Sequence, residues 1–163
     1  DLVRDPSLYD LKAYQRASEM ALSQSAANLP GFYRDLSHTD AGVRYWAIVG
    51  CFNLQKISRL DSKFIRKSLD DDCHHVRAMA AWILYRAGDK SAAQACWNNM
   101  LKNSSYASLK IFNIVDWIGD GTEPYTDAMK ACEFSHGGYV ARMQQYLGVA
   151  LPPAPRKRNR KKK

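Results

Sequence analysis

The segment Asp40-Ala-Gly-Val43-Arg44-Tyr-Trp-Ala47 recurs in altered form as Asp72-Cys-His-His-Val76-Arg77-Ala-Met-Ala80. The distance along the chain from Val43 to Val76, which we call the repeat period, also separates Arg44 from Arg77, Ala47 from Ala80 and Leu36 from Leu69. A fixed internal period of this length is typical of helical-hairpin repeats. The sequence therefore predicts an all-α fold, built as a short α-solenoid.

Each residue type in the repeated element has a physical reason. An Asp before a helix accepts hydrogen bonds from free backbone N–H groups and complements the helix dipole. The Val and the Ala lie on one face and pack between helices. The Arg can reach Asp side chains of its own repeat or of the next. A partly exposed ion pair of this kind is worth only about 0.5 to 1 kcal/mol, so packing is expected to dominate stability.

About four helical hairpins follow an N-terminal helix. We expect that helix over residues 7–27, with Ser7 as its cap, and a first hairpin that starts at Asn28-Leu-Pro30, has a helix to about Ser37 and continues over residues 41–53, capped by Asp40. The second hairpin opens at Asp61 or Ser62, turns at residues 70–72 and stops near Gly88. In the third, Leu109 and Lys110 stand one repeat period after Val76 and Arg77. A shorter fourth pair spans residues 122–147.

Three segments are expected along the chain. Residues 1–28 form an N-terminal segment and helix, residues 29–150 the helical-repeat domain, and residues 151–163 a proline-rich exit with a disordered basic tail. The apolar content of 46% is ample for a core, and no apolar run is long enough to span a membrane. Because the chain starts with Asp1 and lacks a signal-peptide pattern, we expect a processed chain or a piece of a longer one.

The net charge of +8 resides mainly in the tail. Seven of the 24 basic residues lie there, which leaves 17 basic against 16 acidic residues and a body of net charge +1. A nearly neutral body argues against duplex nucleic acid as a partner. The tail can bind sulfated or other anionic polysaccharide, nucleic acid or an acidic membrane by charge, or it can simply aid solubility, and both interpretations stay open. Its basic residues are Arg156, Lys157, Arg158, Arg160, Lys161, Lys162 and Lys163.

Neither the cysteines nor the histidines predict a metal site. The four cysteines (Cys51, Cys73, Cys96 and Cys132) have irregular spacings and no Cys-x-x-Cys pair, so they are expected to be small buried residues. Cys73-His74-His75 beside the acidic run has ligand residue types. Successive helical residues point about 100° apart, however, and adjacent side chains cannot converge on one tetrahedral ion. A polar turn and helix cap is the preferred interpretation.

The aromatic residues divide into two expected groups. Trp46, Trp82 and Trp117 lie inside apolar helices, so packing between repeats is favoured over a carbohydrate-stacking or docking surface. Tyr14, Tyr33 and Tyr139 are expected to be exposed and could line a partner surface.

The repeated Asp-x-x-Val-Arg and Asp-x-x-x-Val-Arg elements resemble HEAT-like repeats over roughly residues 29–147. More specifically, Ala27-Asn-Leu-Pro30, then Leu36, Asp40 and Gly42-Val-Arg-Tyr-Trp-Ala47 resemble the C-terminal helical-repeat region behind the catalytic domain of many bacterial sulfatases, of the arylsulfatase or N-sulfoglucosamine sulfohydrolase type.

That resemblance implies a parent enzyme that hydrolyses sulfate esters or sulfamates with calcium and a formylglycine, and a periplasmic or secreted location. The formylglycine motif Cys/Ser-x-Pro-x-Arg is absent around all four cysteines here. Calcium and formylglycine are therefore expected only in a catalytic domain that this chain does not contain.

Three functions follow as hypotheses, and none places a catalytic residue in this chain. The first is the non-catalytic repeat region of a sulfatase, with the catalytic domain of the same polypeptide as its partner. The second is a free-standing repeat scaffold that binds a protein partner. The third, a nucleic-acid binder acting through the tail, is the least favoured because the body is neutral. The repeat-defining residues are Asp40, Val43, Arg44, Ala47, Asp72, Val76, Arg77, Ala80, Leu109 and Lys110.

Overall fold

A computed structural model describes residues 10–54, 62–103, 105–119, 123–131 and 145–148. The regular elements of these residues are all helical, which confirms the predicted all-α class. The α-helices are α1 (Leu11–Leu22), α2 (Leu29–Asp35), α3 (Ala41–Asn53), α4 (Ser62–Lys67), α5 (His74–Arg86), α6 (Lys90–Asn103), α7 (Ser105–Ile118) and α8 (Thr126–Ala131). Short 3-10 helices cover Ala26–Asn28, Ser68–Asp70 and Glu123–Tyr125.

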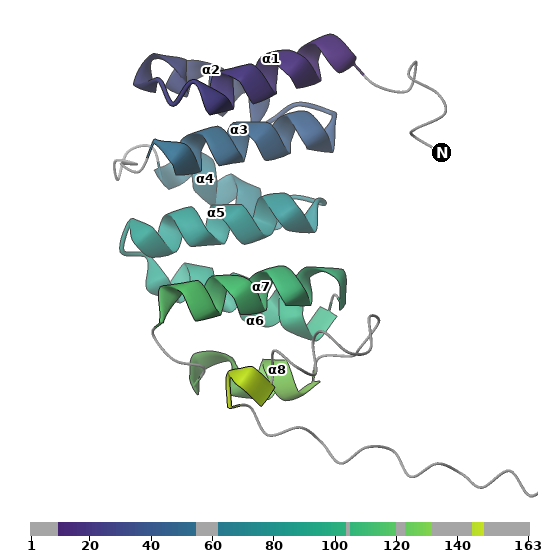
Figure 1. The fold of residues 1–163 in the computed structure, drawn as a ribbon, viewed down its shortest axis with the longest axis vertical. Coiled ribbons are helices and arrows are strands. Elements are labelled where there is room, and N and C mark those ends of the chain that lie inside the picture. The colour runs from purple at the N-terminus through teal and green to yellow at the C-terminus, as the bar shows by residue number, and fades with distance from the viewer. Residues whose placement is uncertain (1–9, 55–61, 104, 120–122, 132–144, 149–163) are drawn as a thin grey trace, which may run out of the picture.

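The helices form two layers (Figure 1). Helices α1, α3, α5 and α7 lie one below another in the front layer, and α2, α4 and α6 lie behind them. In the front layer α1 packs on α3, α3 on α5, and α5 on α7, while α6 contacts both α5 and α7. The chain thus passes repeatedly from one layer to the other as it descends the stack.

Small residues set the spacing at the top of the stack. Helix α1 buries Ala13, Ala17 and Ala21, which recur at every fourth position on one face and allow its backbone to approach α3 closely. Val43 completes the small cluster at this contact, and it is fully buried.

Helix α5 joins the two larger core clusters. Val76, Ala80 and Leu84 belong to the cluster shared with α2, α3 and α4. Ala78 and Ala81 belong to the cluster shared with α6, α7 and α8. A helix that is apolar on opposite faces must be covered on both, and α5 lies in the middle of the described stack.

Some of the predicted helix boundaries hold and others are wrong. Helix α3 spans the predicted residues 41–53, and Gly88 follows α5 with a left-handed φ of 95°. The N-terminal helix, however, begins at Leu11 with Asp10 as its cap and ends at Leu22 instead of residue 27. Ser7 lies outside the described residues.

Of the predicted helix caps, Asp40 is confirmed and Asn28 is wrong. Asp40 accepts hydrogen bonds from the backbone N–H groups of Gly42 and Val43, as expected. Asn28 precedes α2 but makes no side-chain cap, because its amide donates to Met20 O and Ser23 Oγ. The opening helix of the first hairpin also stops at Asp35, short of the expected Ser37.

The remaining predictions fall mostly outside the described residues. Residues 1–9 and 149–163, including the basic tail, are not described, nor is most of the second half of the fourth pair. Among the described helices, none is long and apolar enough to cross a membrane.

Candidate functional site

The two arginines of the repeated element make the same backbone contacts. Arg44 Nη1 donates to the carbonyl oxygens of His38 and Thr39, each at 2.9 Å. Arg77 Nη1 donates to the carbonyl oxygens of Asp71 and Asp72, which stand one repeat period after those two acceptors. Each arginine therefore folds back over the turn that precedes its own helix.

The apolar members of the repeated element are equally matched. Val43 and Val76 are both fully buried, as are Ala47 and Ala80 to within 1%. The second helix starts differently, since Cys73 occupies the cap position of α5 and makes no side-chain cap bond. Asp72 is thus not the cap that the sequence suggested, and its side chain instead meets Arg44.

Arg44 also links one predicted repeat to the next. Its Nε donates to Asp71 Oδ2 at 2.8 Å and its Nη2 to Asp71 Oδ1 at 3.0 Å, so the pair is bidentate. The two side chains are only 10% and 7% exposed, which differs from the partly exposed pair that we expected. Burial acts to raise the pKa of the Asp71 carboxyl, but hydrogen bonds from Arg44 and the Cys73 N–H outweigh it and lower that pKa.

The third predicted repeat departs from this pattern. The side chain of Leu109 is outside the described residues. Lys110 does not fold back over its own turn: its ammonium lies 4.8 Å from the centre of the Tyr45 ring on α3 and 3.5 Å from its hydroxyl. Burial lowers the pKa of Lys110. The basic residue that follows the period in sequence therefore has another role in space, as a cation over an aromatic ring.

A row of rings crosses the front layer beside Lys110. Tyr14 of α1 meets Trp46 edge-on at 6.3 Å, Trp46 lies 6.2 Å from Tyr45, and Tyr45 lies 6.1 Å from His75 of α5. Trp46 is half-buried, in line with a packing role, and Tyr14 is 40% exposed, as predicted. Tyr33 was expected to be exposed but is half-buried and stacks on Phe64. Tyr139 is not described.

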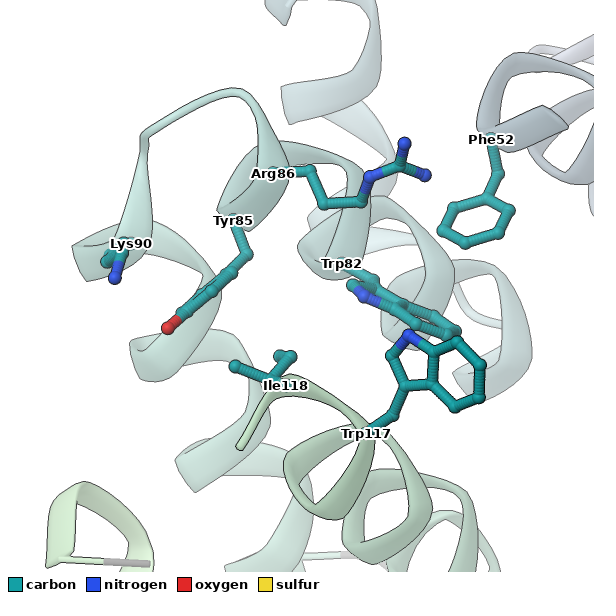
Figure 2. Close-up of a pocket in the computed structure, with 7 residues that line it drawn as sticks. All are labelled: Phe52, Trp82, Tyr85, Arg86, Lys90, Trp117 and Ile118. Atoms are coloured by element: carbon teal, nitrogen blue, oxygen red, sulfur yellow. The ribbon is translucent and has the colours of Figure 1, made fainter. Parts of the chain in front are cut away.

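A hollowed surface lies at the C-terminal ends of α3, α5 and α7. We call it the aromatic pocket; it has a volume of about 680 Å³ and is lined by Phe52, Trp82, Tyr85, Arg86, Lys90, Trp117 and Ile118. Figure 2 shows Trp82, Arg86 and Tyr85 of α5 around the pocket, with Trp117 of α7 on its lower side. Trp117 is 80% exposed, so the prediction that it packs between repeats is wrong.

The cations of the aromatic pocket lie over its rings. The Arg86 guanidinium carbon is 4.8 Å from the centre of the Phe52 ring, and the Lys90 ammonium is 4.9 Å from the centre of the Tyr85 ring. The ring centres of Phe52 and Trp82 lie 4.6 Å apart. The lining combines four aromatic rings with two cations, and no acidic side chain of the described residues belongs to it.

The sequence carries a signal for this pocket that our prediction overlooked. Phe52, Tyr85 and Ile118 follow one another at the repeat period of the Val-Arg elements. They mark the last turns of α3, α5 and α7, so following the period to the helix ends would have brought them together. The exposure of Trp117 also had a signal, since the polar residues Asn113 and Asp116 lie on its side of α7 and are exposed.

Neither the cysteines nor the histidines form a reactive centre in the described residues. Cys51 is fully buried, and Cys73 and Cys96 are half-buried. Burial raises the pKa of the Cys96 thiol to about 11. No group of three His, Cys, Asp or Glu side chains among the described residues is placed to hold a metal ion. Cys132 lies outside the description.

Comparisons with known proteins identify no relative. No family model, no curated protein and no solved structure matches the chain.

Proposed function

We propose that this chain is a non-catalytic helical-repeat scaffold of HEAT-like hairpins, and that it serves as the C-terminal region of a sulfatase. Its partner in this proposal is the catalytic domain of the same polypeptide, on which the stack packs and whose access it helps to shape. The sulfatase part rests on the resemblance carried by residues 27–47. The scaffold part rests on contacts within the stack.

The observation that supports the repeat most strongly is the equivalence of Arg44 and Arg77. Each donates to two carbonyl oxygens, and the two acceptor pairs are themselves one repeat period apart. Stacked copies of one structural unit would place these four acceptor oxygens at the same spacing as the sequence repeat. An unrelated helical bundle would have no reason to keep that register.

A scaffold role also fits the chemistry of the described residues. Buried polar side chains are used in structural contacts: Asp35 receives hydrogen bonds from Arg16 and Arg34, and Arg44 binds Asp71. Cys96, with its raised pKa, is a poor nucleophile at neutral pH. The catalytic chemistry of a parent enzyme would have to come from another domain.

The upstream coding sequence provides the first test. The proposal expects several hundred residues before Asp1 that contain Cys/Ser-x-Pro-x-Arg. A start codon close to Asp1 would contradict the sulfatase role and favour the alternative, a free-standing scaffold that binds a protein partner. The purified chain is expected to hydrolyse no aryl sulfate, and turnover of 4-nitrophenyl sulfate would contradict its non-catalytic role.

A binding measurement between the two parts provides the second test. The catalytic domain, produced without residues 1–163, is expected to bind the separately purified chain and to gain thermal stability from it. Absence of binding between the two folded parts would remove the packing role.

A further inference from the structure

We propose that the aromatic pocket is a binding site for a small organic anion that carries its carboxylate or sulfate beside a flat ring face. The ring can belong to an aryl group or to a sugar, since both present a flat face next to the charged group. This inference does not depend on the sulfatase role, because it uses only the residues of the pocket.

The exposed tryptophan supplies the ring-binding face. Trp117 is 80% exposed although it follows the buried Ile114 and Val115 in the same helix. It lines the aromatic pocket together with Trp82 of α5, so both indoles give apolar surface to the site (Figure 2). A large apolar side chain held open to water at a concave surface is a feature of binding sites, because exposure of such area is otherwise unfavourable.

The cations supply the charge preference. Four arginines form ion pairs with carboxylates. The pairs are Arg16 and Arg34 with Asp35, Arg44 with Asp71, and Arg66 with Asp89. Arg86 makes no ion pair among the described residues, and its only partner there is the Phe52 ring. A guanidinium supported on a ring retains its N–H donors for a carboxylate or sulfate.

Charge in the pocket favours an anion even after the helix ends are considered. The C-terminal ends of α3, α5 and α7 each carry a partial negative charge of about half an electron, and the N-terminal end of α6 carries a matching positive one. The two full positive charges of Arg86 and Lys90 exceed that sum, and no carboxylate of the described residues lines the pocket. A cationic or wholly apolar ligand would leave the Arg86 guanidinium without a counter-charge.

The dimensions fit a ring-sized ligand. The volume of about 680 Å³ lies within the range of small-molecule sites, roughly 300 to 1,000 Å³. The walls come from α3, α5, the start of α6 and α7, so the site exists only when successive helices of the front layer are stacked.

Titration calorimetry on the full chain tests the proposal with 2-naphthoate, with glucuronate and a sulfated disaccharide as sugar probes, and with 2-naphthalenemethanol as the neutral analogue. At least one anionic probe is expected to bind below about 1 mM, and 2-naphthalenemethanol roughly tenfold more weakly than 2-naphthoate. Whether the aryl or the sugar anions bind identifies the ring. Failure of every anion to bind at about 10 mM overturns the proposal.

Two variants locate the site. Trp117→Ala is expected to weaken binding of the anion by about tenfold, and Arg86→Gln to abolish the preference for 2-naphthoate over its neutral analogue. Tyr14→Ala and Arg66→Gln are matched controls elsewhere on the stack and should bind as the parent does. Since Trp117 is largely exposed, its removal should leave the helical circular-dichroism spectrum and the thermal midpoint unchanged.

The basic tail is present in every variant, so its contribution cancels. Anion binding that survives both Trp117→Ala and Arg86→Gln belongs to the tail and overturns the pocket assignment. Equal binding of 2-naphthoate and its neutral analogue also overturns it, because an apolar surface for a protein partner would show no charge preference.

Discussion

The turns before α3 and α5 have the same arginine-to-backbone hydrogen bonds but differ in their ion pairs. In both, an arginine donates to two carbonyl oxygens of its own turn. Arg44 in addition forms a buried bidentate pair with Asp71, whereas the side-chain hydrogen bonds of Arg77 within the described residues go to carbonyls. One repeat period after Asp71 and Asp72 stand two serines, so the sequence offers Arg77 no carboxylates there. The contact shared by the two turns and the contact that couples them are therefore separable.

The largest expected effect tests this difference directly. Arg44→Met keeps most of the side-chain volume but leaves the buried Asp71 carboxylate without its partner, and we expect a loss of about 3 to 5 kcal/mol in the free energy of unfolding. Arg77→Met removes only hydrogen bonds to carbonyls, with an expected loss of about 1 kcal/mol. Urea denaturation measures both. Equal losses would show that the pair with Asp71 adds nothing to the backbone contacts.

The double variant Arg44→Met, Asp71→Asn sharpens the same point. Because the two side chains are partners, the combined loss should be smaller than the sum of the two single losses. Additive losses would contradict direct coupling between the two turns through this pair.

The sequence predicted the buried apolar positions better than the polar contacts between them. The period placed Val43, Val76, Ala47 and Ala80 in the core, where all four are buried. Burial of Arg44 was missed because an ion pair between Arg and Asp side chains is ordinarily at the surface. Asp72 precedes α5 in the repeated element as Asp40 precedes α3, but its side chain meets Arg44 and does not cap the helix.

The pocket shows the same limit. Phe52, Tyr85 and Ile118 could be inferred from spacing, but that Trp82 and Trp117 line the same pocket depends on how α5 and α7 pack. Local sequence records which residues are apolar; it does not record which of them a neighbour will cover. The role of Lys110 was misjudged for a related reason, since its side chain crosses to Tyr45 on α3.

A smaller effect is expected at two contacting positions where the predicted repeats differ in side-chain size. Gly50 of α3 lies against the buried Phe32 ring, with no room for a Cβ, and one repeat period later the matching positions hold Ile83 and Ile65. Gly50→Ala should gain up to about 1 kcal/mol from helix propensity but lose more through the clash, for a net loss of about 1 to 2 kcal/mol.

Phe32→Leu provides the matched background for that substitution. In it the added methyl group has space, so Gly50→Ala should become neutral or stabilising in the same urea titration. A loss that is unchanged by Phe32→Leu would mean that the ring does not set the size of residue 50.

The next effect concerns the helix caps, of which the one before α3 is the stronger. Asp40→Ala removes the bonds to the Gly42 and Val43 N–H groups and should cost about 1 kcal/mol. Cys73→Ser gives α5 a hydroxyl at the matching position and should add about 0.5 to 1 kcal/mol. Thermal midpoints should shift in opposite directions. A neutral or destabilising Cys73→Ser would show that the turn before α5 cannot present a capping oxygen.

The smallest effect is a pH dependence confined to the second turn, where His74 and His75 stand in place of Ala41 and Gly42. Burial and then nearby positive charge lower the pKa of both imidazoles, with Arg77 and Lys110 facing His74 and with His74 and Lys110 facing His75. A lowered pKa means that the unfolded chain binds protons more readily than the folded one. The stabilising contribution is therefore full above the unfolded pKa of about 6.5 and is lost as the pH falls through the folded values.

The expected result is a decline in unfolding free energy between about pH 7 and pH 5 that His74→Gln, His75→Gln reduces. Asp71 does not contribute in this range, because its lowered pKa confines its loss to pH values below about 4. Arg77→Met should also reduce the decline, since it removes the charge that faces His74. The unfolding free energy of the His74→Gln, His75→Gln variant could instead fall with pH as steeply as that of the parent. In that case the pH dependence has another source, and the two turns differ only in their ion pair and cap.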